Sequence, residues 1–506
     1  FRQTGVAART KQVDIVPASR RQRVAFGDFQ TPPELAEQLC QRLGNERPQT
    51  IIEPTCGEGS ILAAAIRRFH NAERAIGFDI SARHAATARR RILEMQTGVD
   101  CQIRAGDFFQ SDWNSILSSC AEPFLIVGNP PWVTNAALGR LESGNHPRKE
   151  NRQGLAGIEA LTGKSNFDVS EWMISRLLEA AAGRRATLAM LCKTAVAHKV
   201  LANAWKSGLP LDRCEIRPID ASRHFGAQVD ACLLVCHLGS RAREKECLVF
   251  DDFSSERAAR RFGLCDGRLV ADLQAHNRIQ HLIGRGFRWR SGVKHDCAAI
   301  FELRQEGTDL RNGLGEKTDL EGHHVYPLLK SSHLARGETG SLSRQMLVPQ
   351  RRVGQETASL AERAPKTWRY LLRHGERLDR RASSVYRNQP RFSIFGVGPY
   401  TFCKWKVAVS GFYKSWRFVS VGPVQNRPVI CDDTCYFLPC HSAAEARQRA
   451  AHLNSERGRE FFSAFVFNQS KRPLTAEILG LLDLDALAAE FDRVPRQRTR
   501  SATRSR

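Results

Sequence analysis

The sequence has no long apolar stretches, although it is 506 residues long and 42% hydrophobic. No run approaches the roughly 18 consecutive apolar residues of a membrane-spanning helix, and no apolar signal segment is visible. We therefore expect a protein without membrane association, located in the cytoplasm of a bacterium or archaeon. Its 15 cysteines are then expected to remain free thiols in a reducing compartment.

Closely spaced cysteine pairs are also missing. Cys431, Cys435 and Cys440 lie near one another, but they contain no Cys-x-x-Cys pair and occupy a hydrophobic stretch typical of strands. No metal site is therefore predicted. The adjacent Asp432 and Asp433 share this strand context, which favours the edge of a domain over a paired-carboxylate site.

Acidic residues are scarce relative to basic ones, with 53 Asp and Glu against 76 Lys and Arg and a net charge of +23. Residues 1–240 contain 30 basic and 24 acidic side chains, whereas the remainder contains 46 and 29. The length allows two sizeable hydrophobic cores. The second half is the better candidate for contacting a phosphate backbone, because most of the excess charge is there.

The tetrapeptide Asn129-Pro130-Pro131-Trp132 follows the apolar run Phe124–Val127 and Gly128. A buried strand that ends in this way presents amide and carbonyl acceptors beside a flat aromatic face. Two such acceptors could bind an exocyclic adenine amine and free its lone pair for attack, while the indole stacks on the base. An ordinary strand-ending turn would use the same residue types.

Three apolar stretches upstream each lead to an acidic residue, namely Glu53, Asp79 and Asp107. The first is followed by Gly57, Gly59 and a helix-forming run, which lets the backbone approach a ligand at a helix N-terminus. Any one of these acids could be a solvated loop carboxylate. Their spacing instead predicts that all three lie at the carboxyl edge of one parallel sheet, where such folds bind ligands.

This series resembles the motifs of the gamma-class, TaqI-type, S-adenosylmethionine-dependent N6-adenine DNA methyltransferases, with residues 29–34 similar to their amino-terminal cofactor motif. The resemblance implies that Asn129, Pro130, Pro131 and Trp132 are catalytic, although the family aromatic is usually Tyr or Phe. It places Thr31 at the methionine moiety of S-adenosylmethionine, Asp79 at the ribose and Asp107 at the adenine. The cofactor-binding residues that it implies are Thr31, Glu53, Thr55, Cys56, Gly57, Asp79, Ile80, Asp107 and Phe108.

The resemblance continues to the carboxy-terminal part of the chain. Residues 163–173 are similar to a helix motif whose acid, here Asp168, and aromatic line the cofactor pocket. Residues 224–235 are similar to a hairpin in which Phe225 would face the flipped base, although a core position suits Phe225 equally well. Basic and aromatic residues alternate within 285–295 and 400–418, a pattern that suits either DNA contact or strands with one buried face.

We therefore predict an α/β, Rossmann-like class I methyltransferase domain with a mostly parallel seven-stranded sheet, joined to a mixed α+β target-recognition domain. The predicted segments are a basic tail at 1–24, the catalytic domain at 25–240, a connector at 241–286, the recognition domain at 287–490 and a basic tail at 491–506.

The predicted activity is site-specific methylation of adenine N6 in double-stranded DNA, with S-adenosylmethionine as cofactor. A restriction-modification or related defence system is the expected context, with any cognate restriction endonuclease encoded separately. Three alternatives remain: methylation of RNA adenine, methylation of protein glutamine, and a catalytically silent DNA-specificity subunit. The intact Asn-Pro-Pro-Trp sequence argues against the last of these.

Overall fold

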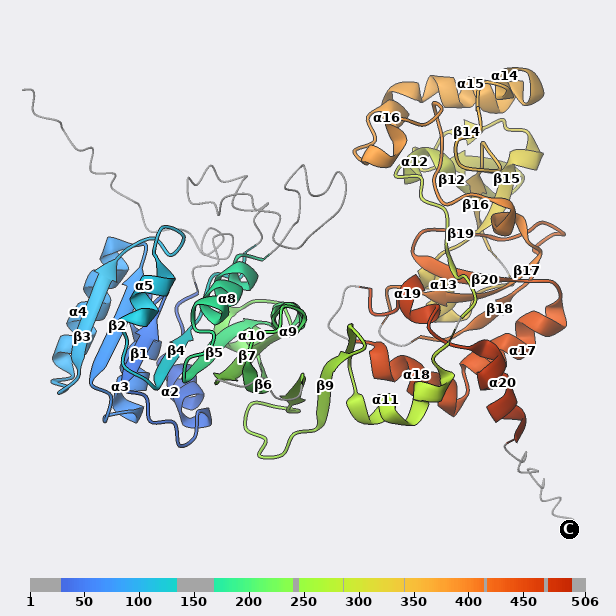
Figure 1. Cartoon of the computed structure of the whole chain (residues 1–506). Coiled ribbons are helices and arrows are strands. Elements are labelled where there is room, and N and C mark those ends of the chain that lie inside the picture. Colours follow the sequence, from blue (N-terminus) through green and yellow to red (C-terminus); the bar gives the residue numbers. More distant parts are fainter. Residues whose placement is uncertain are drawn as a thin grey trace, which may run out of the picture. The chain divides into compact units, whose positions relative to one another are not determined.

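The computed structural model describes residues 29–133, 168–239, 245–284, 286–340, 342–413, 416–467 and 472–493. The chain divides into two compact units, Phe1–Leu269 (unit 1) and Val270–Arg506 (unit 2); their elements are labelled in Figure 1. The predicted tail 1–24 lies outside the described residues, as does nearly all of the tail 491–506. The same is true of residues 134–167, which follow the predicted catalytic loop.

Unit 1 contains one large sheet with the spatial order β10-β9-β8-β6-β7-β5-β4-β1-β2-β3. Its strands are β1 (Thr50–Glu53), β2 (Arg74–Asp79), β3 (Asp100–Ala105), β4 (Phe124–Gly128), β5 (Ala186–Lys193), β6 (Leu211–Ile219), β7 (Ala231–Leu238), β8 (Glu246–Val249), β9 (Arg260–Cys265) and β10 (Arg268–Val270). Neighbouring strands from β3 to β5 run parallel, whereas β7 is antiparallel to both β5 and β6. This arrangement confirms the predicted mostly parallel sheet.

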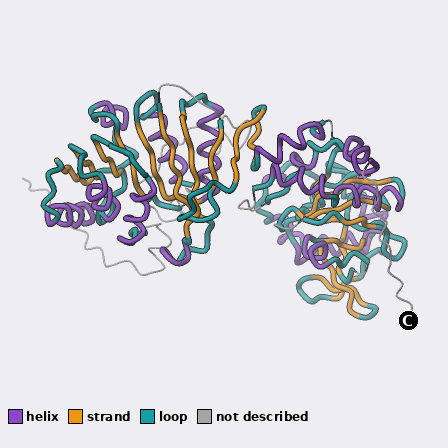
Figure 2. The backbone as a smooth tube through the Cα atoms, turned by 90° about the horizontal axis from the view of Figure 1, so that it is seen from below, coloured by secondary structure: helices purple, strands orange, loops and turns teal. Residues whose placement is uncertain are grey.

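Helices cover both faces of this sheet (Figures 1 and 2). They are α2 (Pro33–Arg42), α3 (Ser60–Arg68), α4 (Ala82–Glu94), α5 (Trp113–Ser118), α8 (Val169–Ala180), α9 (Thr194–Lys206) and α10 (Ala221–Phe225). On one face, Ile51, Leu125 and Val127 pack with α2, α3 and α4 in a single hydrophobic core. Residues at alternate positions face the other side, where α8 and α9 contact β5. Strands buried on both faces account for continuous apolar runs such as β4.

The sheet has ten strands, three more than predicted. β8 pairs in parallel with β6, and β9 pairs with β8, so part of the predicted connector 241–286 extends the catalytic sheet. Phe262 of β9 is fully buried against His198 and Trp205 of α9. The rest of that segment contributes α11 (Leu273–Ile279), which packs against α18 of unit 2.

Unit 2 is a mixed α+β domain with two sheets, of order β14-β13-β12-β16-β15-β19 and β11-β20-β17-β18. The strands are β11 (Arg290–Ser291), β12 (Glu302–Glu306), β13 (Asp309–Asn312), β14 (Lys317–Thr318), β15 (Val325–Leu329), β16 (Arg344–Leu347), β17 (Trp405–Ser410), β18 (Val419–Val421), β19 (Ile430–Cys431) and β20 (Cys435–Cys440). The remaining helices are η1 (Gln280–Leu282), α12 (Ala298–Phe301), η2 (Gly322–His324), α13 (Ser331–Arg336), α14 (Leu360–Arg363), α15 (Pro365–Arg373), α16 (Gly375–Asp379), η3 (Ser384–Tyr386), η4 (Pro399–Phe402), α17 (Ala443–Leu453), α18 (Glu456–Phe465), α19 (Ala476–Leu479) and α20 (Leu484–Arg493).

Some of the alternating basic and aromatic residues of unit 2 lie in its core. Trp289 and Phe418 are buried, and their ring centroids lie 5.8 Å apart. Lys406 of β17 is also fully buried, and its Nζ donates to the carbonyls of Thr401 at 3.1 Å and Val429 at 2.6 Å. Trp289, Lys406 and Phe418 are therefore core positions, whereas Lys404, Tyr413 and Arg417 of the same stretches are exposed.

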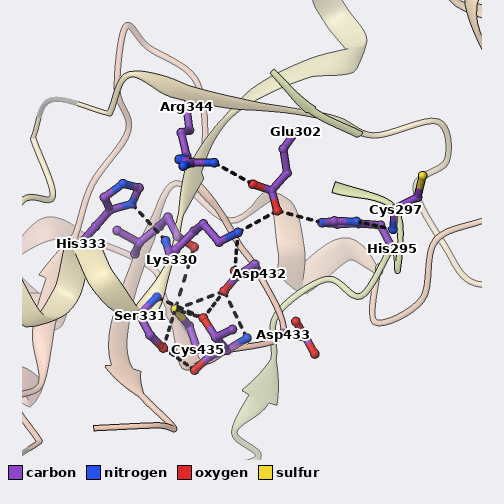
Figure 3. Close-up of polar contacts among 12 residues, drawn as sticks. His295, Cys297, Glu302, Lys330, Ser331, His333, Arg344, Asp432, Asp433 and Cys435 are labelled. Atoms are coloured by element: carbon purple, nitrogen blue, oxygen red, sulfur yellow. Dashed lines mark hydrogen bonds and ion pairs between the residues drawn. The ribbon is translucent and has the colours of Figure 1, made fainter. Parts of the chain in front are cut away.

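A network of buried charges links the two sheets of unit 2 (Figure 3). Lys330 Nζ lies 2.7 Å from Glu302 Oε1 and 3.5 Å from Asp432 Oδ2. Arg344 Nη1 lies 3.0 Å from Glu302 Oε2, and His295 Nε2 lies 3.4 Å from Glu302 Oε1. Glu302 begins β12, Lys330 follows β15, and Asp432 lies between β19 and β20. The network thus joins the six-stranded sheet to the segment that leads into the four-stranded sheet.

Candidate functional site

The carboxyl ends of β1, β2, β3 and β4 meet at one edge of the unit 1 sheet, because these strands are parallel neighbours. Glu53 and Asp79 are the last residues of β1 and β2. Asp107 lies two residues beyond β3, and Asn129 immediately follows β4. The structure therefore brings the three predicted acids together with the start of the predicted catalytic loop.

Glu53 is almost completely buried beneath the first glycine turn, with 2% of its surface exposed. The backbone N–H of Leu62 donates to Glu53 Oε2 at 2.8 Å. Burial raises the pKa of Glu53 well above its ordinary value, and the nearby charge of Asp79 raises it further. Through its hydrogen bond to the Leu62 N–H, Glu53 fixes the first turn of α3 from inside the fold.

The glycine turn is held by Asp79. The N–H of Gly57, a residue with a φ of +50°, donates to Asp79 Oδ2 at 2.9 Å. The N–H of Ser81 donates to the other carboxylate oxygen at 2.8 Å, and His84 Nδ1 lies 3.5 Å from that same oxygen. The Asp79 side chain remains 12% exposed. A carboxylate oxygen can accept more than one hydrogen bond, so Asp79 can organise this turn and still bind a ligand hydroxyl.

The turn between β1 and α3 contains Thr55 and Cys56. Cys56 is buried, and its N–H donates to the Phe78 carbonyl at 2.6 Å. Burial raises the pKa of the Cys56 thiol, so it is a neutral packing group rather than a nucleophile. Thr55 is half-buried, and its Oγ1 would lie 3.8 Å from a Cβ at Gly128. The backbone at the end of β4 thus passes close to this turn.

Ile80 and Phe108 differ in their exposure. Ile80, directly after Asp79, is 59% exposed and provides an open apolar surface at the edge of the sheet. Phe108 is 5% exposed and packs against Trp113 with ring centroids 4.7 Å apart, so it belongs mainly to the core. Asp107 is half-buried, and its Oδ1 accepts a hydrogen bond from the Phe109 N–H at 2.9 Å.

The predicted amino-terminal motif contacts both the glycine turn and the predicted catalytic loop. Gln30 Oε1 accepts a hydrogen bond from the Glu58 N–H at 2.9 Å. Asn129 Nδ2 lies 3.3 Å from the Phe29 carbonyl and 3.2 Å from Thr31 Oγ1. The structure therefore places Thr31 beside Asn129, although 98 positions separate the two in the sequence.

These contacts determine which way the Asn129 amide faces. Because the Phe29 carbonyl can only accept a hydrogen bond, Nδ2 must face it. Asn129 Oδ1 is then buried and has no hydrogen-bond partner among the described residues. A buried polar atom without a partner is costly and requires an explanation. The arrangement leaves one fixed acceptor at the end of β4, ready for an incoming donor.

The remaining loop residues are more enclosed than predicted. Pro130 is buried, Pro131 is half-buried, and Trp132 is 5% exposed. The Trp132 ring meets Phe225 edge to face at 5.1 Å and lies 5.9 Å from the Phe29 ring. A base could enter between Trp132 and Phe225 only if these two rings separated.

Two residues at this edge were not predicted from the sequence. Lys193, the last residue of β5, donates from Nζ to the Trp132 carbonyl at 2.8 Å and lies 2.6 Å from Asp168 Oδ2. Leu191 accepts a hydrogen bond from Trp132 Nε1 at 3.2 Å through its carbonyl. Asp168, expected at the cofactor pocket, is thus paired with Lys193 and also caps α8 through Ser170. Neither Lys193 nor Leu191 stands in a motif, so only their spatial position reveals these contacts.

Among the described residues, no group of three or more His, Cys, Asp or Glu side chains is arranged to hold a metal ion. Over the same residues, no helix combines the length and hydrophobicity needed to cross a bilayer.

Comparison with known proteins identifies sequence relatives. A model of the N-6 DNA Methylase family matches residues 18–192. The Type II methyltransferase M.NspV of Nostoc sp. (strain ATCC 29411 / PCC 7524) is 40% identical over 470 residues, which cover 92% of this chain and 98% of M.NspV. The Type II methyltransferase M.CvrRI of Paramecium bursaria Chlorella virus XZ-6E is 32% identical over 116 residues, or 23% of this chain and 27% of that protein.

Among solved structures, the Type IIL restriction-modification enzyme MmeI in complex with DNA is similar, with a TM-score of 0.52 and 12% identity. The match covers 91% of this chain but 64% of the MmeI chain, so the present chain spans less than two thirds of that enzyme. At this identity the likeness concerns the fold alone. The family match spans the residues from Thr31 to Trp132 that line the sheet edge, and the identity to M.NspV extends over nearly all of both chains, so this protein belongs to the type II DNA methyltransferases of the N-6 DNA methylase family.

Proposed function

We propose that this protein methylates the N6 amine of an adenine that is flipped out of duplex DNA, using S-adenosylmethionine as its cofactor. The observation that carries the proposal is the buried Asn129 Oδ1, which has no hydrogen-bond partner among the described residues. An exocyclic amine is a donor, and it is the group that would satisfy this acceptor. Base flipping is required because the amine cannot be reached inside the stacked duplex.

In this proposal, the acceptors at the end of β4 activate the amine. Its lone pair is delocalised into the purine ring, which makes it a poor nucleophile. Hydrogen bonds to Asn129 Oδ1 and to the Pro130 carbonyl would hold the nitrogen towards tetrahedral geometry and stabilise its developing positive charge. Trp132 would stack on the base after Phe225 moves away from it. The methylated amine is acidic enough to lose its proton to water, so the site needs no dedicated base.

The residues at the sheet edge suit the cofactor. S-adenosylmethionine supplies, when bound, a methyl group on a positively charged sulfur. Asp79 has a partly exposed carboxylate for ribose hydroxyls, and the exposed Ile80 offers an apolar surface for a purine ring. Asp107 would accept from the adenine amine, and Thr31 would contact the methionine moiety beside Asn129.

Unit 2 is proposed as the target-recognition domain, within the predicted bounds 287–490. This proposal is supported by the charge of the chain beyond residue 240, which contains 46 basic and 29 acidic residues. A separately encoded restriction endonuclease that cuts the same DNA sequence is the proposed functional partner.

The proposal is tested by incubating purified protein with plasmid DNA and labelled S-adenosylmethionine, followed by nucleoside analysis and sequencing. We expect N6-methyladenine at one short sequence. Parallel reactions with total RNA and with a glutamine-containing peptide address the two alternative substrates. Label that appears only in RNA or in peptide would contradict the proposal, as would the absence of label from every substrate.

Asp79→Ala should weaken cofactor binding, because the variant loses a charged acceptor. We expect a loss of about 1.5 to 3 kcal/mol, the scale for hydrogen bonds to a charged group. Isothermal titration calorimetry with S-adenosylmethionine measures the change. Asp100→Ala is the matched control, because Asp100 is exposed at the amino end of β3, away from the site. If the Asp79 and Asp100 variants bind S-adenosylmethionine with equal affinity, Asp79 is not part of the cofactor site.

DNA binding by the full chain should depend steeply on salt. If six or more Lys and Arg residues contact phosphates, raising the salt from about 50 to 200 mM should weaken binding by roughly 10³-fold or more. Fluorescence anisotropy measures this loss, with a labelled duplex that contains the sequence that the protein methylates. A scrambled duplex should show the same salt slope with weaker affinity, because base contacts persist in salt. A flat salt response would argue against phosphate contacts as the main source of affinity.

A further inference from the structure

We propose that Lys193 is a positioning residue for methyl transfer, which sets the orientation of the Asn-Pro-Pro-Trp loop by holding the Trp132 carbonyl. Its Nζ donates to that carbonyl at 2.8 Å and to Asp168 Oδ2 at 2.6 Å. The inference rests on the function proposed above, because it assigns the loop to catalysis. It adds a residue that does not touch the substrate but acts through the residues that do.

The loop depends on anchors at its two ends. Pro130 and Pro131 have no N–H groups and a fixed φ, so the middle of the loop is stiff and cannot donate backbone hydrogen bonds. At the first end, Asn129 Nδ2 is held by the Phe29 carbonyl and Thr31 Oγ1. At the second end, the carbonyl and the indole N–H of Trp132 are both held by β5. Because the segment is stiff and anchored at both ends, the loss of either anchor would move the two acceptors of the proposed mechanism, Asn129 Oδ1 and the Pro130 carbonyl.

The two anchors of Trp132 act on different atoms. Trp132 Nε1 donates to the Leu191 carbonyl at 3.2 Å, which orients the indole. Lys193 holds the main-chain oxygen, which orients the peptide plane. The next carbonyl, that of Val133, accepts from the Val169 N–H at 2.8 Å. Of these contacts, only the one from Lys193 is made by a charged side chain, and charge-assisted hydrogen bonds are the stronger kind.

Lys193 itself is held in place by Asp168. A lysine side chain has many rotamers, so it can fix a carbonyl only if its ammonium group is restrained. The side chains of Lys193 and Asp168 are 24% and 8% exposed, so the pair is largely shielded from water. Asp168 is fixed in turn by the N–H of Ser170 at 3.1 Å and by the Ser170 hydroxyl at 2.5 Å. The ammonium group therefore sits between a rigid carboxylate and the loop carbonyl.

A second lysine provides a matched control. Lys199 Nζ lies 3.3 Å from Glu171 Oε2, so this pair connects α9 to α8, whereas the Lys193–Asp168 pair connects the end of β5 to the start of α8. The Lys199 side chain is 58% exposed, and its ion pair is separate from the hydrogen bonds by which Leu191 and Lys193 hold Trp132. Lys199→Met likewise removes a lysine and its ion pair with a carboxylate at the start of α8, yet it leaves the anchor of Trp132 in place.

The test compares turnover of K193M, K193R, K199M and the double variant K193M/D168N with that of the full-length wild-type protein. The substrate is a duplex containing the sequence that the wild-type protein methylates, and thermal unfolding and S-adenosylmethionine affinity are measured for each variant. We expect K193M to lower kcat by about a hundredfold, the scale for a small misplacement of reacting groups, with the cofactor Kd within about twofold. K193R, which keeps a cationic donor, should recover a substantial part of the rate, and K199M should behave as wild type.

The double variant decides between positioning and simple charge balance. K193M leaves the carboxylate of Asp168 buried and unpaired, which can destabilise the fold. K193M/D168N removes that charge and so corrects this destabilisation, but it does not restore the lost hydrogen bond to the Trp132 carbonyl. Recovery of the wild-type rate by the double variant would overturn the proposal, as would equal losses in K193M and K199M. A wild-type product other than N6-methyladenine would contradict the proposed function, yet the same rate comparison would still decide the role of Lys193.

Discussion

Asn129→Ala is expected to lower kcat by at least roughly 10²-fold to 10³-fold, the loss that follows removal of one preorganised hydrogen-bonding group from a site of developing charge. The variant loses the Oδ1 acceptor, which is buried and without a partner in the described structure. Because this acceptor acts on the amine as its positive charge develops, the loss should fall on kcat rather than on cofactor affinity. Single-turnover methylation and calorimetry measure the two quantities.

The Asn129 amide also holds Phe29 and Thr31, so a second variant is needed. Asn129→Asp keeps an acceptor but removes the donor to the Phe29 carbonyl, which separates activation of the amine from anchoring of the amino-terminal segment. Asn114→Ala, at an exposed position on α5, is the matched control for removal of an Asn side chain. Methylation by Asn129→Ala at close to the rate of the control would refute the proposed mechanism.

Glu302→Gln is expected to lower the free energy of unfolding of unit 2 by about 3 kcal/mol, the scale for breaking a buried ion pair. Glu302 is 7% exposed and binds Lys330 at 2.7 Å and Arg344 at 3.0 Å. Burial alone would raise the pKa of Glu302, but the hydrogen bonds and charges of His295 and Lys330 outweigh burial and lower the pKa to about 2. The charged form is therefore the one that stabilises the fold.

The sign of the pH dependence follows from this lowered pKa. In the unfolded chain the Glu302 pKa is near its ordinary value of 4.5, so the contribution is fully present above that pH and is lost as the pH falls towards about 2. A difference of this size corresponds to about 3 kcal/mol. Urea unfolding followed by tryptophan fluorescence should show a large difference between wild type and variant at pH 7, which narrows below about pH 4.5.

Glu306→Gln is the control for this experiment, because Glu306 lies on the same strand and is exposed. A surface ion pair contributes little, so this variant should stay within about 1 kcal/mol of wild type. If the two glutamine variants unfold alike at pH 7, the buried network does not stabilise unit 2.

Much of unit 1 could be predicted from local patterns. Short apolar runs that end in Glu53, Asp79 and Asn129 predicted parallel strands with polar residues at one edge, and the structure confirms that arrangement. The prediction succeeds because the carboxyl ends of parallel neighbours must share an edge. β8 and β9 were missed because short strands in a polar segment look like a connector until their pairing partners are known.

Contacts between distant residues could not be predicted in this way. The hydrogen bond from Asn129 to Phe29 joins residues 100 positions apart, and the one from Lys193 to Trp132 joins residues 61 positions apart. Lys406 looked like a candidate for DNA contact, yet it is fully buried. No periodicity in the sequence distinguishes a buried lysine from an exposed one, because its environment is created by strands that come together only on folding.

The amino-acid order was therefore sufficient for the fold class and, through the resemblance of its motifs, for the family, since strand period and motif spacing are local properties of the chain. Tertiary packing settled the remaining questions: which atom of the Asn129 amide has no partner among the described residues, how far Trp132 is buried, and which lysine holds the Trp132 carbonyl. The physical reason is that hydrogen bonding and burial depend on distances between atoms, and the folded chain sets these distances between residues far apart in sequence.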